Sequence, residues 1–124
     1  MRTMTTQVGG KELTLTADFK ASADLMNDVA DPMYIMREAL LEVMMIDKGV
    51  PYQPRWMFTV ENIPKMMHIA LKRAHPEMKL SEIQDLVFEQ GFTESRAIIG
   101  NWLQLIVGPK PETKLSGEGD SEGN

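Results

Sequence analysis

Groups able to do chemistry are few in this sequence of 124 residues, and the two histidines come first. His68 and His75 lie seven residues apart, so on one helix they share a face but stand about 10 Å apart along its axis. That separation is too large for both imidazoles to bind one metal ion. His75 also precedes Pro76, where a helix normally ends. We therefore interpret both as ordinary surface or boundary histidines.

Acidic residues gather in two clusters that resemble a paired-carboxylate site or a weak calcium site. Neither cluster has the glycine and ligand spacing of an EF-hand loop. A solvated helix face is the interpretation that we favour for both. The clusters are Asp24, Asp28 and Asp31, and Glu82, Asp85 and Glu89.

The sequence contains no motif for nucleophilic catalysis or phosphate binding. Gly9-Gly10 lacks the Lys-Ser/Thr pair and the helix start of a phosphate-binding loop, and no serine sits in a nucleophile-elbow pattern. The absence of cysteine excludes disulfides, thiolate zinc sites and cysteine nucleophiles. The sequence therefore predicts a protein that is not an enzyme, with no catalytic, cofactor-binding or metal-binding residues.

The segment Lys79–Val107 has the helix–turn–helix outline of some DNA-binding proteins. A recognition helix exposes side chains that read base edges, and the last helix offers only Arg96, Asn101 and Gln104 for that task. We favour an ordinary helical hairpin, and a small DNA-binding regulator stays the less favoured alternative.

Composition points away from nucleic acid and membranes. The net charge is −5, which argues against binding to a phosphate backbone. No stretch approaches the roughly 20 apolar residues that cross a bilayer, and the first ten residues lack the apolar core of a signal peptide. The composition is unusual in its 11 methionines. Methionine both fills irregular cores and provides adaptable binding surfaces.

The first predicted element is an N-terminal β-hairpin. Leu13, Leu15, Ala17 and Phe19 alternate with polar residues, which is typical of a strand with one buried face. Gly9-Gly10 supplies the positive φ angles of a tight turn.

Two helices are predicted next. The first covers Lys20–Ala30, with Ala21, Leu25 and Val29 facing inward. Asp31-Pro32 then provides an N-cap and a proline at the first helical position of a helix that runs to Asp47. Only three charged residues, Arg37, Glu38 and Glu42, interrupt its apolar residues. Since a surface helix shows a narrower apolar stripe, this helix is expected to be central to the fold or covered by a partner.

The long loop Val50–Phe58 contains two prolines and four large apolar or aromatic side chains. Two interpretations stay open: Trp56 and Phe58 form a small core beneath the loop, or the loop and the preceding helix form a protein-binding surface. The candidate partner-binding residues are Met44, Met45, Tyr52, Trp56, Met57 and Phe58.

Three more helices follow in the prediction. Thr59 or Asn62 caps a helix with Met66 and Met67 on its buried face, Ser81 caps a helix to Gln90, and Thr93 caps a helix to Val107. Gly91 suits the left-handed position between the last two. The fold class is therefore α+β and mainly helical, with an N-terminal β-hairpin, four to five helices and a C-terminal tail. Residues 1–108 form one compact domain, and the acidic residues 109–124 are expected to be disordered.

The order of elements resembles the small tail assembly chaperones of long-tailed phages, prophages and gene transfer agents. The resemblance covers about residues 8–107 in layout. It rests on the Gly-Lys-x-Leu-x-Leu strand entry at 10–15, the helix at 21–29, the Leu-Ser helix at 80–87 and the Gly-Phe-Thr-Glu-Ser turn at 91–95. The loop Val50–Phe58 and the many methionines depart from that pattern.

This resemblance implies a non-enzymatic helper in the cytoplasm of the host cell. Such proteins coat the long, apolar, helical tape measure protein and keep it soluble until tail tube protein polymerises around it. The partners implied are the tape measure protein and the tail tube protein, and the oligomeric state stays open. The alternatives are a virion structural protein, such as a tail or head-tail connector component, and the DNA-binding regulator.

Overall fold

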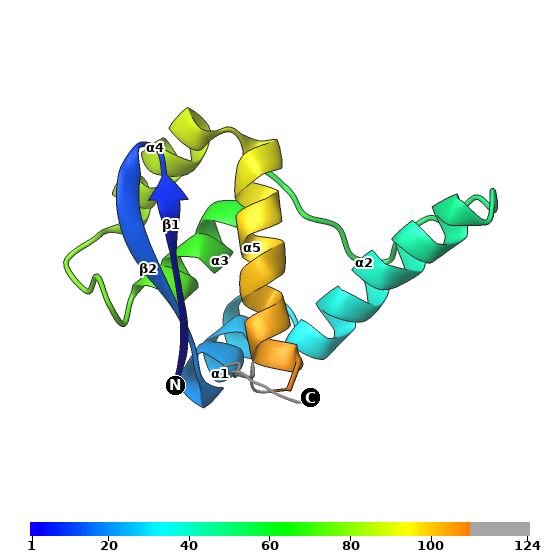
Figure 1. Cartoon of the computed structure of the whole chain (residues 1–124), viewed down its shortest axis with the longest axis horizontal. Coiled ribbons are helices and arrows are strands. Elements are labelled where there is room, and N and C mark those ends of the chain that lie inside the picture. The colour runs from blue at the N-terminus through cyan, green and yellow to red at the C-terminus, as the bar shows by residue number, and fades with distance from the viewer. Residues whose placement is uncertain (110–124) are drawn as a thin grey trace, which may run out of the picture.

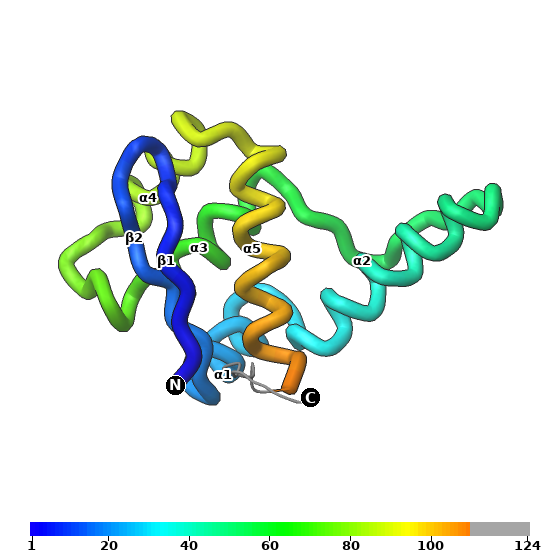
Figure 2. The backbone as a smooth tube through the Cα atoms, viewed as in Figure 1, coloured from blue at the N-terminus to red at the C-terminus, as the bar shows by residue number. Residues whose placement is uncertain are grey.

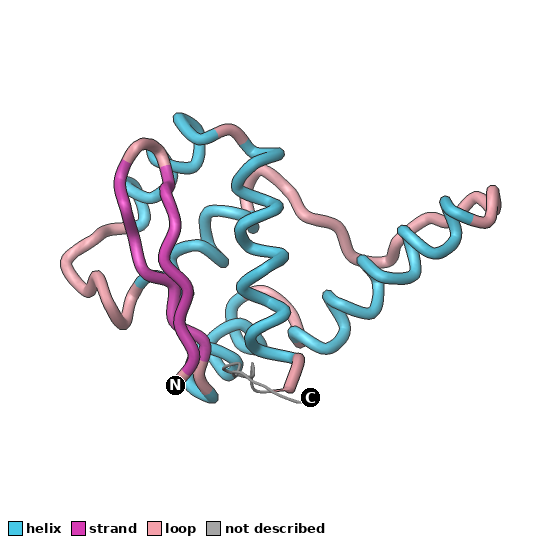
Figure 3. Tube along the Cα trace, viewed as in Figure 1, coloured by secondary structure: helices cyan, strands magenta, loops and turns pink. Residues whose placement is uncertain are grey.

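The structure is a computed structural model that describes residues 1–109. Two strands come first, β1 (Arg2–Val8) and β2 (Lys11–Ala17). Five helices follow, namely α1 (Phe19–Asp28), α2 (Pro32–Asp47), α3 (Asn62–Leu71), α4 (Leu80–Gln90) and α5 (Phe92–Val107). Figures 1 and 3 show this arrangement, which confirms the predicted α+β, mainly helical fold. Of the predicted tail, all but Pro109 lies outside the described residues.

The strands form an antiparallel hairpin whose register pairs Thr5 with Thr14. Gly9 and Gly10 have φ angles of 58° and 85°, which glycine adopts without steric cost. The prediction that Phe19 continues the buried face of the strand is wrong, because its side chain is 86% exposed. Asp18 Oδ1 accepts a 2.9 Å hydrogen bond from the N–H of Ala21, so the chain turns into α1 at Phe19 and the alternation ends.

Helix α5 is the centre of the core and lies between the hairpin and α2 in Figure 2. Trp102 is fully buried on α5, and its indole N–H donates a 2.8 Å hydrogen bond to the carbonyl of Thr16. Met66 and Met67 of α3 are also fully buried, which confirms that these two methionines are packing residues.

The caps of the last two helices differ from the prediction. Helix α4 begins at Leu80, ahead of Ser81, with the N–H of Lys79 donating to Glu82 Oε1 at 3.3 Å. Helix α5 begins at Phe92, ahead of Thr93. For α5 the physical reason is Gly91, whose φ of +97° turns the chain from one helix directly into the next.

Helix α2 is not central. Its buried residues, Pro32, Ile35, Met36 and Glu38, all lie in its first two turns, and no residue from Ala39 to Val50 is buried. In Figure 1 the helix points away from the rest of the molecule, and the chain returns alongside it. The expectation of a central helix is therefore wrong, and an outer helix with an apolar surface remains.

Candidate protein-binding site

The side of α2 that faces the returning chain is polar. Glu38 is only 1% exposed, and its Oε1 accepts hydrogen bonds from the Tyr52 hydroxyl at 2.8 Å and from the N–H of Arg55 at 2.7 Å. A buried carboxylate needs such partners because an unpaired buried charge is very unfavourable. Glu38 therefore holds the segment Val50–Phe58, which we call the return segment, against α2.

These hydrogen bonds favour the charged form of Glu38. They hold its pKa below the ordinary value of 4.5, with the N–H of Arg55 as the larger cause and the Tyr52 hydroxyl as the next. The same hydrogen bond retains the proton of Tyr52, so the pKa of Tyr52 lies above its ordinary value of 10.0. The pair is thus a carboxylate and a neutral phenol at neutral pH.

A second polar contact ties α2 to the core helix α5. Arg96 Nη2 lies 3.7 Å from Glu42 Oε1, and its guanidinium stands 5.1 Å from the ring centroid of Phe58. Phe58 also meets Trp56 edge to face, with ring centroids 5.0 Å apart. Both rings are half-buried and pack on the core, so the return segment contributes to the fold.

The outward side of α2 is mainly apolar, with the exposed Arg37 among its apolar residues. Met33, Leu40 and Met44 are 64%, 52% and 49% exposed, and their spacing of seven and four residues places them within about 40° of one another around the helix. We call these three residues the α2 stripe. Beside it a shallow groove, lined by Met36, Leu41 and Val107, runs between α2 and the end of α5.

Beyond Met36, helix α2 is therefore inverted relative to an ordinary surface helix. Glu38 and Glu42 face the return segment and α5, whereas the α2 stripe faces outward. An amphipathic helix normally buries its apolar side against its own core. A contiguous apolar patch left on the surface is a candidate site for binding another molecule.

The six candidate partner-binding residues do not come together on one surface. Met44 belongs to the α2 stripe, and Met57 is exposed on the return segment. Met45 is half-buried. Tyr52, Trp56 and Phe58 are half-buried too, and each makes the contacts within the chain given above. Partner binding by these residues stays a prediction.

Sequence reasoning missed Met33, Leu40 and Glu38. The heptad-like spacing of Met33, Leu40 and Met44 was a signal that could have indicated a stripe for helix packing. A lone glutamate inside an apolar helix was the signal for a buried, hydrogen-bonded carboxylate.

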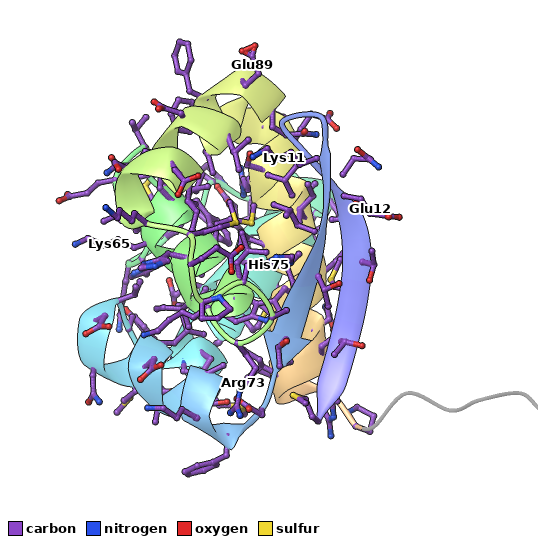
Figure 4. The ribbon with its side chains drawn as sticks, turned by 90° about the vertical axis from the view of Figure 1, so that its left-hand side faces the viewer. Lys11, Glu12, Lys65, Arg73, His75 and Glu89 are labelled. Atoms are coloured by element: carbon purple, nitrogen blue, oxygen red, sulfur yellow. The ribbon has the colours of Figure 1, made fainter. Side chains whose placement is uncertain are left out.

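One of the two histidines makes a structural contact. Within residues 1–109, no group of three or more His, Asp or Glu side chains could hold a metal ion. His75 Nε2 accepts a 3.0 Å hydrogen bond from the N–H of Thr14, which anchors the loop after α3 to the hairpin. Figure 4 shows His75 beside the strands, with Lys65 and Arg73 nearby on the same face of the molecule.

Helix α5, the counterpart of a recognition helix, packs through Ile99, Trp102 and Leu103, which are all buried. Its one arginine, Arg96, lies against Glu42 and Phe58. None of the helices in residues 1–109 combines the length and apolar content that crossing a membrane requires.

Comparisons with protein-family models, with curated proteins and with solved structures find no match to this chain.

Proposed function

We propose that this chain is a phage tail assembly chaperone that binds and solubilises the tape measure protein, without enzymatic activity. The observation that carries the proposal is the α2 stripe, an apolar row on the outward side of a projecting helix. The order of elements, which resembles that chaperone family, supplies the identity of the partner. A tape measure protein is long, helical and apolar, so it presents the kind of surface that such a stripe covers.

The binding mode that we propose is helix packing. Two helices associate when apolar anchors at seven- and four-residue spacing interdigitate, and the α2 stripe has that spacing over about three turns. Two of its three side chains are methionines, whose flexible thioethers adapt to varied partners. Covering a large aliphatic side chain completely is worth about 1.5–3 kcal/mol, so three anchors supply useful affinity without a deep pocket.

Co-expression tests the proposal. The tape measure protein encoded near this chain is expressed alone, with the wild-type chain, and with the double variant Leu40→Glu and Met44→Glu. We expect the wild type to raise the soluble fraction of the tape measure protein and to co-purify with it, and the double variant to lose both effects.

The control is Phe88→Glu, which also places a charge on an exposed apolar position, because Phe88 on α4 is 74% exposed. This variant should behave as wild type. Equal loss by Phe88→Glu and by the double variant, or no solubilisation by the wild type, contradicts the proposal. Finding the chain in purified virions would instead support a structural role in the particle.

A further inference from the structure

The two edges of the β-hairpin differ. The outer edge of β2 is bound at two backbone groups by side chains from elsewhere in the fold. The N–H of Thr14 donates to His75 Nε2, and the carbonyl of Thr16 accepts from the Trp102 indole. Thr14 and Thr16 therefore point their backbone groups away from β1.

The strand register fixes the direction of the backbone groups on β1. Thr5 is paired with Thr14, and Thr3 with Thr16. In an antiparallel pair, residues opposite each other either exchange hydrogen bonds or both point away. Thr3, Thr5 and, two residues on, Gln7 thus point their N–H and C=O groups outward from β1.

This outer edge of β1 carries no internal partner along most of its length. Gly9, the next outward position, donates its N–H to Gln90 Oε1 of α4 at 2.7 Å. Within residues 1–109, no hydrogen bond is made by the backbone groups of Thr3, Thr5 or Gln7. Figure 4 shows the hairpin at the border of the molecule.

The devices by which proteins protect an edge strand are also missing from β1. In natural proteins, lysine, proline, a bulge or short length keeps an edge strand from pairing with another chain. The segment Thr3–Gln7 contains neither lysine nor proline, and all seven residues of β1 pair with β2 in unbroken register. The three outward residues are exposed. Such an edge is suited to pairing with another strand.

We propose that β1 pairs antiparallel with β1 of a second copy of this chain, with the two-fold axis at Thr5. This register sets Thr5 opposite Thr5 of the second copy, and Thr3 opposite Gln7 of the second copy. Every residue in those pairs points its backbone groups toward the other strand, so each pair exchanges both of its N–H···O=C bonds. The edge is self-complementary, which is what a symmetric dimer requires.

The side chains are compatible with this pairing. Met4 stands opposite Thr6 of the second copy, and Arg2 opposite Val8 of the second copy, so no like charges face each other. The result is a four-stranded sheet in the order β2-β1-β1-β2. The hairpin and α2 lie on opposite sides of the molecule in Figure 1, so the dimer leaves both α2 stripes free.

Two measurements on the full chain test the dimer. Light scattering during size-exclusion chromatography should give twice the chain mass of 14.0 kDa. Amide hydrogen exchange should then protect Thr3, Thr5 and Gln7 as well as Met4 and Thr6, whose N–H groups bond to β2. A monomer at all attainable concentrations overturns the proposal, and so does a dimer in which only Met4 and Thr6 are protected.

Charge exchange at the two-fold axis tests the register. Thr5→Lys and Thr5→Glu each place like charges opposite each other and should raise the dimer dissociation constant about fivefold. An equimolar mixture of the two variants should restore the dimer through the Lys–Glu pair. Thr14→Lys is the matched control, because Thr14 lies beside Thr5 one strand further from the axis. A Thr5→Lys chain that dimerises as the wild type does, or a mixture that stays monomeric, overturns the register.

Discussion

The Tyr52 hydroxyl donates a 2.8 Å hydrogen bond to the carboxylate of Glu38, fourteen residues earlier in the chain. The acceptor is buried on α2, and the donor lies on the return segment. Since an unsatisfied buried charge is costly, the position of the return segment and the rotation of α2 depend on each other. This relationship explains why the apolar α2 stripe faces outward.

Replacing Tyr52 by Phe should move the pKa of Glu38 upward toward 4.5, because one of the two hydrogen bonds that lower it is lost. Amide exchange at Arg55 should accelerate as the return segment loosens. An NMR titration of the Glu38 carboxyl measures the first effect. Tyr34→Phe is the control, because within residues 1–109 the Tyr34 hydroxyl makes no hydrogen bond. An unchanged Glu38 pKa in Tyr52→Phe would contradict the role given to this pair.

The pair also predicts a plateau of stability with pH. The folded pKa of Glu38 is lowered from 4.5, so its contribution is present above pH 4.5 and is lost as pH falls through the folded value. The folded pKa of Tyr52 is raised from 10.0, so its contribution is present below pH 10.0 and is lost as pH rises through the folded value. Chemical denaturation of wild type and Glu38→Gln across this range should show that the variant loses less unfolding free energy at acid pH than the wild type does. The same loss of stability at acid pH in both proteins would contradict the role given to Glu38.

Two glycines with open space at the Cβ position should respond to alanine in opposite directions. At Gly91 a Cβ meets nothing within 4 Å, but φ is +97°, so Gly91→Ala should destabilise the fold by about 1–3 kcal/mol through backbone strain. Gly100 also has open space and lies within α5, so Gly100→Ala should stabilise it by about 0.5–1 kcal/mol. Thermal unfolding monitored by circular dichroism measures both. Melting temperatures of the two variants that shift in the same direction would contradict this prediction.

Trp102→Phe should destabilise the protein through a polar effect and a packing effect. The carbonyl of Thr16 loses its indole donor, and an unsatisfied buried acceptor costs about 1–3 kcal/mol. The smaller ring also leaves a cavity in a fully buried position. Trp56→Phe is the matched control because Trp56 is half-buried, and its loss of stability should be clearly smaller. Urea unfolding measures the loss of unfolding free energy in both variants, and equal losses would contradict this prediction.

The fold could be predicted where a local rule decided the outcome. Asp31-Pro32 started α2 at the expected residue, and Gly9-Gly10 turned the hairpin as predicted. Phe19 could not be placed from alternation alone, because the Asp18 cap competes with the strand and wins. The starts of α4 and α5 were each missed by two residues. For α5 the reason is that Gly91 joins the two helices without a side-chain cap.

The candidate site was harder to predict than the fold. The apolar surplus of α2 was visible in the sequence, but which of its sides faces outward depends on Glu38 and its donors in the return segment. Those donors are 14 and 17 residues away in the chain, so no helical periodicity reveals them. Trp56 and Phe58 were ambiguous for the same reason, because the contact of Phe58 with Arg96 joins residues about forty positions apart.

The contacts between the two ends of the described chain bear on how the protein is made. Arg2 donates hydrogen bonds to the carbonyls of Leu105 and Gly108, and the carbonyl of Thr16 accepts one from the Trp102 indole. A lone two-stranded hairpin is marginally stable in water, so β1 and β2 gain their support only when α5 has left the ribosome. Folding of residues 1–109 is therefore expected to be completed in one late step, after α5 has been synthesised, and the hairpin must stay free of other strands until then.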